Sequence, residues 1–351
     1  MNTDIIKTIL DLPVWSQQKI SMTEKNVIVT MDASSQHAII TFTFACQLLW
    51  PIISAALQKQ FPGIKFELQQ KILQHVIQSE VQPRVGVKNI IAIASGKGGV
   101  GKSTVAVNLA LALQAEGASV GILDADIYGP SLPLLLNLAE PPESENGKTL
   151  EPIVRYGLQA MSIGCLLQEK DTAMIWRGPM ASTAMQQIFR DCQWKDLDYL
   201  MIDLPPGTGD IQLTLAQKIP VSGIVIVTTP QDIALIDAQK AYRMFEKVNI
   251  PVLGVVENMS YHICEKCGHH EALFGEGGGE SLQSDYGLEL LGKLPLTKVI
   301  REDCDQGEPT VVHNPNSEIS QLFKEIAMRV SALLANRAVY KPSRIPKISV
   351  E

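Results

Sequence analysis

The sequence predicts an α/β protein, with a mostly parallel sheet covered by helices on both faces and a small α+β domain in front of it. Three observations support this fold class. After Lys88, short runs of Val, Ile and Leu alternate with helical patterns, and strands this apolar are typical of a parallel sheet buried on both faces. A glycine-rich segment joins the first run to a helical pattern. Finally, proline and glycine at 83–87 separate this part from residues 1–82, whose pattern differs.

Length and composition exclude several classes of protein. A chain of 351 residues is long enough for two domains. With 46% hydrophobic and 19% charged residues, it has the composition of a globular protein. The formal net charge is −7, so no overall positive field would attract nucleic acid or an anionic membrane. We therefore expect neither as a partner.

Two segments near the amino terminus bear on localisation. Residues 1–15 carry Asp4, Lys7 and Asp11 and lack the uninterrupted apolar core of a signal peptide. The uncharged stretch 38–57 is long enough to span a bilayer, but Thr41 and Thr43 alternate with apolar residues. This alternation favours a strand that runs into a helix, and we expect a cytoplasmic protein.

The expected organisation is a small α+β domain at 1–82, a linker at 83–87, a large domain at 88–340 and an irregular tail at 341–351. Apolar patterning predicts the elements of both domains. In the small domain we expect strands at 26–32, 37–44 and 64–68 and a helix at 50–61. In the large domain we expect strands at 90–94, 119–124, 199–203, 223–228, 252–257 and 288–294, with helices at 102–116, 233–248 and 316–335.

A phosphate-binding loop follows the first strand of the large domain. The segment after residue 94 matches the pattern G-x-x-x-x-G-K-[S/T] in full, and a helical run follows it. The glycines allow backbone N–H groups to approach phosphate oxygens at the positive end of that helix. Lys102 is expected to reach the β- and γ-phosphates of ATP, and the Ser103 hydroxyl to bind Mg²⁺. The expected nucleotide-binding residues are Gly96, Lys97, Gly98, Gly99, Val100, Gly101, Lys102, Ser103 and Thr104.

A second lysine, Lys97, stands at the front of this loop. Gly-Lys-Gly-Gly-Val-Gly-Lys-Ser is similar to the deviant phosphate loop of dimeric ATPases such as MinD, ParA and the nitrogenase iron protein. In that class the front lysine crosses the dimer interface to the partner's nucleotide and acts much as an arginine finger does. The resemblance implies a homodimer and a catalytic role for Lys97. A solvated lysine without a role is the alternative.

Two strands of the large domain end in aspartates, beside the phosphate loop in this architecture. Asp124 ends the strand at 119–124, and Asp126 follows it. The resemblance implies that Asp126 orients the attacking water and that Asp124 lies near Mg²⁺, whereas capping of the next turn is the alternative for Asp124. Asp203 ends the strand at 199–203 in the Walker B position, which holds Mg²⁺. The prolines and glycines after Asp203 suit a loop that responds to the γ-phosphate.

Asn258, after the strand at 252–257, aligns with the asparagine that contacts the adenine in this class of ATPases. An asparagine at the end of a strand is also a common turn residue. Both readings stay open at this point.

Of the six cysteines, only Cys264 and Cys267 form a C-x-x-C pair. Two thiolates at this spacing can bind one metal, but a closed tetrahedral site needs four ligands. A symmetric dimer would bring two pairs together and complete a Cys₄ site for a [4Fe-4S] cluster or Zn²⁺. Two alternatives lie within one chain: a zinc knuckle that adds His269 and His270, and a redox disulfide.

In combination, the motifs resemble the Mrp/ApbC family of P-loop iron-sulfur carrier ATPases. They are GKGGVGKS, DADIYGPS, WRGP at 176–179, DLPPGTGD, ENMS, and C-x-x-C followed by FGEGGG. The match covers nearly all of residues 88–340. The first domain stands where many members carry a small MIP18-like domain and diverges from it. At best, Phe44-Ala45-Cys46-Gln47 corresponds to the Thr-Pro-Ala-Cys-Pro stretch of that domain.

The resemblance implies a carrier that binds a [4Fe-4S] cluster between two subunits through Cys264 and Cys267. The carrier would pass the cluster to recipient apoproteins, with an iron-sulfur scaffold as a further partner. ATP and Mg²⁺ are the implied cofactors, and a slow ATPase, with Lys97 and Asp126 as catalytic residues, would control the exchange.

Two other functions share the phosphate loop. A MinD- or ParA-like positioning ATPase with a structural zinc site needs a surface for membrane or DNA, but the apolar residues of the helix at 316–335 are expected in the core. A ligase resembling dethiobiotin synthetase would leave the cysteine pair without a role.

Overall fold

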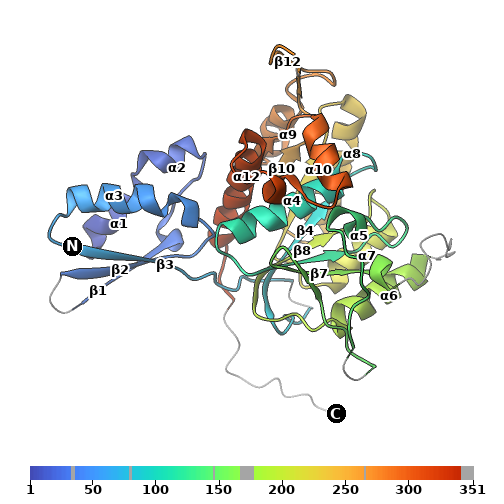
Figure 1. Ribbon diagram of the computed structural model, residues 1–351, viewed down its shortest axis with the longest axis horizontal. Coiled ribbons are helices and arrows are strands. Elements are labelled where there is room, and N and C mark those ends of the chain that lie inside the picture. Colours follow the sequence, from blue (N-terminus) through green and yellow to red (C-terminus); the bar gives the residue numbers. More distant parts are fainter. Residues whose placement is uncertain (33–35, 79–80, 145–146, 167–177, 265, 341–351) are drawn as a thin grey trace.

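The computed structural model describes residues 1–32, 36–78, 81–144, 147–166, 178–264 and 266–340. Within these residues a small amino-terminal domain lies beside a large α/β domain (Figure 1). The small domain holds a three-stranded sheet and the large domain an eight-stranded sheet, and a two-stranded hairpin projects from the large domain. Part of the WRGP motif, at 176–177, and the expected irregular tail at 341–351 lie outside the described residues.

The small domain packs its helices on a sheet of order β1-β2-β3. Strands β1 and β2 are antiparallel, whereas β2 and β3 are parallel because the chain crosses over through a helix between them. Its helices and strands are α1 (Asn2–Leu10), α2 (Pro13–Gln17), β1 (Val27–Met31), β2 (His37–Phe42), α3 (Trp50–Gln60) and β3 (Lys65–Gln70). The three predicted strands and the predicted helix are confirmed, whereas α1 and α2 are additional.

The core of the small domain includes part of the large one. The rings of Trp15, Phe42 and Phe44 lie with centroids 6.0 to 6.2 Å apart. The same hydrophobic cluster contains Met328 and Ala332 of helix α12, which spans Glu318–Ala335. Because α12 supplies part of this core, the two domains are joined by shared apolar packing.

The connection between β3 and the large domain also packs against that domain. Ile72 belongs to the hydrophobic core of the large sheet, and the His75 backbone N–H donates to the side-chain oxygen of Asn89 at 3.0 Å. His75 also pairs with Val339 near the end of the described chain. The residues around Ile72 and His75, before the predicted linker at 83–87, therefore pack against the large domain. Val87, the last residue of that linker, begins the first strand of the large sheet.

The large sheet confirms the predicted fold class. Its order is β13-β10-β9-β4-β8-β5-β7-β6, and every neighbouring pair is parallel except the edge pair β7 and β6. The strands are β4 (Val87–Ala94), β5 (Val120–Asp124), β6 (Ile153–Arg155), β7 (Leu158–Ser162), β8 (Leu197–Asp203), β9 (Gly223–Thr228), β10 (Val252–Glu257) and β13 (Leu290–Lys293). All six predicted strands are present, and the β6-β7 pair was not predicted.

Helices cover both faces of this sheet and form one hydrophobic core on each. Helices α4 and α12 pack together on one face, and α6, α7 and α8 contribute to the core on the other. Besides α12, the helices are α4 (Lys102–Ala115), α5 (Leu132–Leu135), α6 (Gly178–Asp191), α7 (Asp210–Lys218), α8 (Asp232–Lys247), α9 (Gly278–Tyr286), α10 (Lys298–Asp305) and α11 (Thr310–His313). The predicted helices correspond to α4, α8 and α12.

Two expectations about apolar segments can be compared with the structure. The uncharged stretch 38–57 forms most of β2 and α3, and none of the helices in the described ranges is long and apolar enough to cross a membrane. In α12, Phe323, Ile326 and Val330 are buried. The apolar face of this helix therefore belongs to the core, as predicted.

Candidate nucleotide and metal site

The phosphate loop lies between β4 and α4, as its sequence predicts. Gly99 and Gly101 have φ values of 81° and 80°, in the left-handed region that glycine adopts without steric cost. The loop borders a cavity of about 260 Å³. This cavity is lined by Ser95, Lys97, Gly98, Gly99, Gly101, Lys102, Ser103, Thr104, Asp126, Ser131, Leu135 and Pro206.

Glycine at two loop positions also permits close packing. A Cβ at Gly96 would collide with the backbone of Asp237, and a Cβ at Gly101 would collide with the side-chain amide of Asn258. The loop is thus held by contacts from α8 and from the end of β10. The glycines of the loop therefore allow neighbouring segments to pack closely against it, in addition to allowing phosphate to approach its backbone.

Lys102 and Asp203 form a buried ion pair at the base of the site. Lys102 is 6% exposed and Asp203 is fully buried, and the Nζ of Lys102 lies 2.5 Å from the Oδ1 of Asp203 and 3.4 Å from the Oγ of Ser103. The other carboxylate oxygen of Asp203 is buried and has no hydrogen-bond partner in the described part of the chain. A buried carboxylate oxygen without a partner suits a hard cation such as Mg²⁺.

Asp124 lies opposite Asp203 on the neighbouring strand β5. Its carboxylate accepts hydrogen bonds from the backbone N–H groups of Asp126, Ser131 and Leu132 and from the Ser162 hydroxyl, at 2.9 to 3.1 Å. Burial, together with the nearby charge of Asp203, raises the pKa of Asp124 to about 7. These contacts favour the turn-capping role, and the predicted contact of Asp124 with Mg²⁺ stays a prediction.

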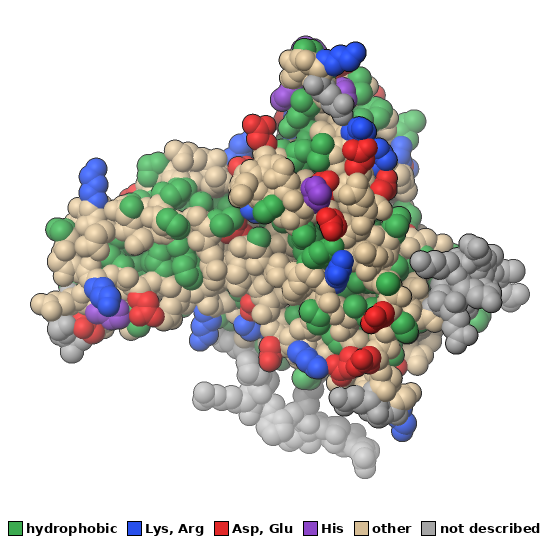
Figure 2. Space-filling view, in the orientation of Figure 1, with side chains coloured by type: hydrophobic (Ala, Val, Ile, Leu, Met, Phe, Trp, Pro, Cys, Tyr) green, Lys and Arg blue, Asp and Glu red, His purple; other side chains and the backbone are tan. Residues whose placement is uncertain are grey.

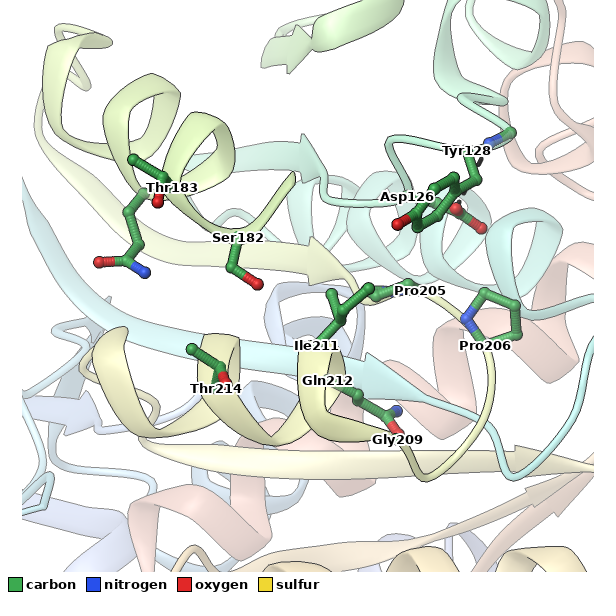
Figure 3. Close-up of a pocket in the computed structure, with 12 residues that line it drawn as sticks. Asp126, Tyr128, Ser182, Thr183, Pro205, Pro206, Gly209, Ile211, Gln212 and Thr214 are labelled. Atoms are coloured by element: carbon green, nitrogen blue, oxygen red, sulfur yellow. Dashed lines mark hydrogen bonds between the residues drawn. The ribbon is translucent and has the colours of Figure 1, made fainter. Parts of the chain in front are cut away.

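Asp126 lies at the junction of two cavities (Figure 3). Its carboxylate accepts a long hydrogen bond of 3.4 Å from the N–H of Gly129. Burial raises the pKa of this carboxyl above its ordinary value. Asp126 therefore borders the phosphate cavity, where the sequence predicts a residue that orients water.

The second cavity, of about 980 Å³, was not predicted from the sequence. It lies between α6 and α7, and Figure 3 shows Ser182 and Thr183 on one helix facing Thr214 and Ile211 on the other. Gln212 also lines it; this residue is 2% exposed, and neither atom of its amide has a partner among the described residues. In the sequence, the one feature that could have indicated this cavity is the position of Gln212 two residues after the DLPPGTGD segment.

Asn258 contacts the phosphate loop directly. Its side-chain amide donates to the carbonyl of Val100 at 2.8 Å, and its backbone N–H donates to the carbonyl of Thr228. The side chain therefore ties the end of β10 to the phosphate loop. Contact with adenine stays a prediction.

The C-x-x-C pair lies in the projecting hairpin formed by β11 (His262–Ile263) and β12 (His270–Glu271). Within the turn, the Cys264 N–H donates to the His269 carbonyl at 2.9 Å, and the Gly268 N–H donates to the Cys264 carbonyl at 2.8 Å. Cys264 is half-buried and Cys267 is exposed. The hairpin stands clear of the rest of the molecule at the top of Figures 1 and 2, with histidine side chains on it.

The hairpin does not form a complete metal site within the described residues. No group of three or more His, Cys, Asp or Glu side chains converges there on a common centre. The zinc knuckle with His269 and His270 therefore stays an untested alternative. One chain presents two thiols, and a four-ligand site would need further ligands.

The other four cysteines lie away from this hairpin. Cys46, Cys192 and Cys304 are buried and Cys165 is partly buried. Burial raises the pKa of Cys165 and Cys304 to about 11 and that of Cys192 to about 12, and it also raises the pKa of Cys46. Thiols that stay protonated are poor metal ligands, which agrees with packing roles.

The strand, phosphate loop and helix, together with the Walker B aspartate, define a P-loop nucleotide-binding protein. A sequence model of the ParA group described as NUBPL iron-transfer P-loop NTPase matches residues 86–331. The chain belongs to this family of iron-transfer P-loop NTPases, the Mrp/ApbC family.

Similar proteins occur in bacteria and animals. The iron-sulfur cluster carrier protein of Haemophilus influenzae is 60% identical over 266 residues, which cover 75% of this chain and 72% of the relative. The protein of the same name from Escherichia coli is 61% identical over 255 residues, covering 72% and 69%. The mouse iron-sulfur cluster transfer protein NUBPL is 49% identical over 251 residues, covering 71% and 78%.

Solved structures support the fold. A nucleotide-binding protein from Archaeoglobus fulgidus, in complex with ADP, is 38% identical with a TM-score of 0.57, covering 66% of this chain and 90% of that protein. The cell division ATPase MinD of Pyrococcus furiosus is 24% identical with a TM-score of 0.54, covering 70% and 99%. The second likeness supports the fold alone.

Proposed function

We propose that this protein is an ATP-binding iron-sulfur cluster carrier that holds a [4Fe-4S] cluster between two subunits and transfers it to apoproteins. The observation that carries the proposal is an accessible C-x-x-C hairpin that follows the strand contacting the phosphate loop. The names of the bacterial and mouse relatives agree with it. We further propose that the protein acts in the cytoplasm, with an iron-sulfur scaffold and recipient apoproteins as partners.

The nucleotide half of the function rests on three side chains. The Lys102 ammonium would bind the β- and γ-phosphates of ATP, while Ser103 and Asp203 would hold Mg²⁺. The bound metal would offset the phosphate charge. Support for this assignment comes from the Lys102–Asp203 ion pair and from the second, unpartnered oxygen of Asp203.

Hydrolysis would depend on Lys97 and Asp126. Asp126 would accept a hydrogen bond from the attacking water and orient it, because its carboxylate borders the phosphate cavity. Lys97, which also lines that cavity, would supply positive charge to the partner's transition state. Slow turnover is part of the proposal, since a carrier must retain its cargo between encounters.

The cluster half of the function rests on Cys264 and Cys267. Each chain would give two thiolates, and two chains related by a two-fold axis would give the four that a [4Fe-4S] cluster takes. The cluster is cargo, so its ligands must be reachable by a recipient. The exposed hairpin satisfies that requirement, because Cys267 is exposed and Cys264 is half-buried.

Cysteine substitutions test this proposal. We expect Cys264→Ala and Cys267→Ala each to abolish stable cluster binding while leaving the dissociation constant of ATP within about twofold, since the phosphate loop is built from other residues. The wild type should hold one cluster per dimer after anaerobic reconstitution. Iron, acid-labile sulfide, absorbance and light scattering measure these quantities.

Cys165→Ala is the matched control, because the Cys165 thiol is partly buried and lies outside the hairpin. The Cys165→Ala protein should keep its cluster. One zinc per monomer without acid-labile sulfide would instead favour the single-chain knuckle. A cluster that persists in both hairpin variants would refute the ligand assignment.

A further inference from the structure

The end of strand β10 touches both the phosphate loop and the segments that carry the cysteine hairpin. Asn258 donates to the Val100 carbonyl of the phosphate loop at 2.8 Å. The preceding residue, Glu257, is fully buried. The carboxylate of Glu257 contacts segments next to the cysteine hairpin. Two adjacent residues at the end of β10 therefore contact the phosphate loop and the surroundings of the hairpin.

The carboxylate of Glu257 joins three separate segments. It accepts a hydrogen bond from the hydroxyl of Ser260, in the turn that leads to the hairpin. It accepts a second from the N–H of Gly279 in α9, at 2.6 Å. The Nζ of Lys293 in β13 lies 3.8 Å from its Oε1 and 2.7 Å from a carboxylate oxygen of Glu280.

These contacts leave little freedom around Glu257. A Cβ on Gly279 would lie 2.6 Å from Leu290 and 3.2 Å from the Oε2 of Glu257, so the close approach of α9 requires glycine. A buried carboxylate is tolerated only when several donors compensate for its lost hydration. Moving any one of the three segments away from Glu257 would therefore be costly.

The chain between Glu257 and Cys264 is fastened to a neighbouring segment along its length. Ser260 donates its N–H to the carbonyl of Leu294 at 2.9 Å, and Leu296 donates its N–H to the carbonyl of Tyr261 at 2.7 Å. The His262 ring nitrogen Nδ1 lies 3.1 Å from the carbonyl of Leu296. Because these hydrogen bonds restrain residues 260–262, a displacement at the end of β10 would move the hairpin as well.

We propose that Glu257 is a positioning residue that transmits the nucleotide state of the phosphate loop to the cysteine hairpin. The proposal rests on the carrier function proposed above and assigns the coupling to the end of β10. When ATP binds and the loop shifts, Asn258 moves with the Val100 carbonyl, and the Glu257 carboxylate carries that shift to Ser260 and α9. The orientation of Cys264 relative to its counterpart in the second subunit then changes.

Hydrogen exchange on the cluster-free, full-length protein tests this coupling. We expect ATP with Mg²⁺ to change the exchange rates of segment 259–264 by about fivefold or more in the wild type, the range typical of coupled sites. In Glu257→Gln, whose amide can no longer accept from both donors, ATP affinity should stay within about threefold. The exchange response should shrink below about twofold.

Glu280→Gln is the matched control. Glu280 also pairs with Lys293 but is half-exposed, and neither Ser260 nor Gly279 is among its hydrogen-bond partners in the described residues. This variant should keep the wild-type response. A full response in Glu257→Gln, or no response in the wild type, would overturn the proposal.

Ser260→Ala provides a second test if Glu257→Gln folds poorly. It removes one hydrogen bond to the carboxylate, and the response should fall to about half or less, whereas an unchanged response would refute the relay. In cluster-loaded protein, Glu257→Gln should abolish the effect of ATP on cluster release to a chelator. The exchange experiment needs no cluster, so it separates failure of the relay from failure of the carrier function.

Discussion

At the scale of single residues, two buried carboxylates face one lysine at the base of the nucleotide site. Asp124 and Asp203 are register partners on adjacent strands, and both are fully buried. Lys102 pairs with Asp203, while the pKa of Asp124 rises to about 7 through burial and the charge of Asp203. A divalent cation would supply positive charge that the described protein atoms lack. This balance is the physical reason to expect Mg²⁺ at Asp203.

Lys102→Ala should weaken ATP binding by roughly tenfold to a hundredfold, because a charge-assisted hydrogen bond contributes about 1.5–3 kcal/mol. Titration calorimetry with ATP and Mg²⁺ measures the change. Lys97→Ala serves as the control within the same loop and should bind ATP with nearly unchanged affinity. An unaltered dissociation constant in Lys102→Ala would contradict the assigned phosphate contact.

At the scale of secondary structure, helix α4 connects the nucleotide site to the small domain. Lys102 is its first residue, and Glu116 follows its last. The Oε2 of Glu116 accepts a hydrogen bond from the backbone N–H of Leu48 at 3.2 Å. Burial raises the pKa of Glu116 to about 7, and its second oxygen has no partner in the ranges that the structure describes.

Glu116→Gln should stabilise the protein at alkaline pH. The folded-state pKa of Glu116, about 7, exceeds the ordinary value of 4.5, so the wild type loses stability as the pH rises from about 4.5 to about 7. Glutamine does not titrate and keeps an oxygen for the Leu48 N–H. Thermal unfolding at pH 5 and pH 8 should show a gain of at most about 3 kcal/mol at pH 8 and little gain at pH 5. An equal gain at both pH values would contradict the role of ionisation.

At the scale of the whole molecule, the two domains share helix α12, and the proposed function requires a second chain. The small domain adds its aromatic cluster to Met328 and Ala332. The interface between two chains is proposed, and Lys97 is the residue expected to act across it. Lys97 is one of the residues that line the phosphate cavity.

Mixed dimers of Lys97→Ala and Lys102→Ala chains should recover about half of the wild-type ATPase rate, because one of the two sites regains both lysines if Lys97 acts in trans. Each parent homodimer should be nearly inactive. Dimers isolated with two different affinity tags allow this rate to be measured. Mixed dimers no more active than either parent would argue against the arrangement in trans.

The sequence by itself determined the fold class, the phosphate loop, and six strands and three helices of the large domain. These features are local. Six apolar runs marked six strands because strands buried on both faces exclude polar residues. The phosphate loop was recognised because its glycines and its lysine form a short motif of consecutive residues that binds phosphate. The elements that were not predicted are α1, α2, α5, α6, α7, α9, α10, α11, the β6-β7 pair and the β11-β12 hairpin. All but α6 have nine residues or fewer, and such short elements depend on the surface against which they pack.

Only the tertiary structure decided which distant residues meet. Asp124 and Asp203 are adjacent through strand pairing, so the charge balance at the site follows from sheet order. Gln212 and Glu257 look ordinary in the sequence. In the structure, the buried side-chain amide of Gln212 has no hydrogen-bond partner among the described residues, and the carboxylate of Glu257 is surrounded by donors from three segments. Desolvation and hydrogen bonding between distant segments depend on three-dimensional packing, which local sequence patterns do not specify.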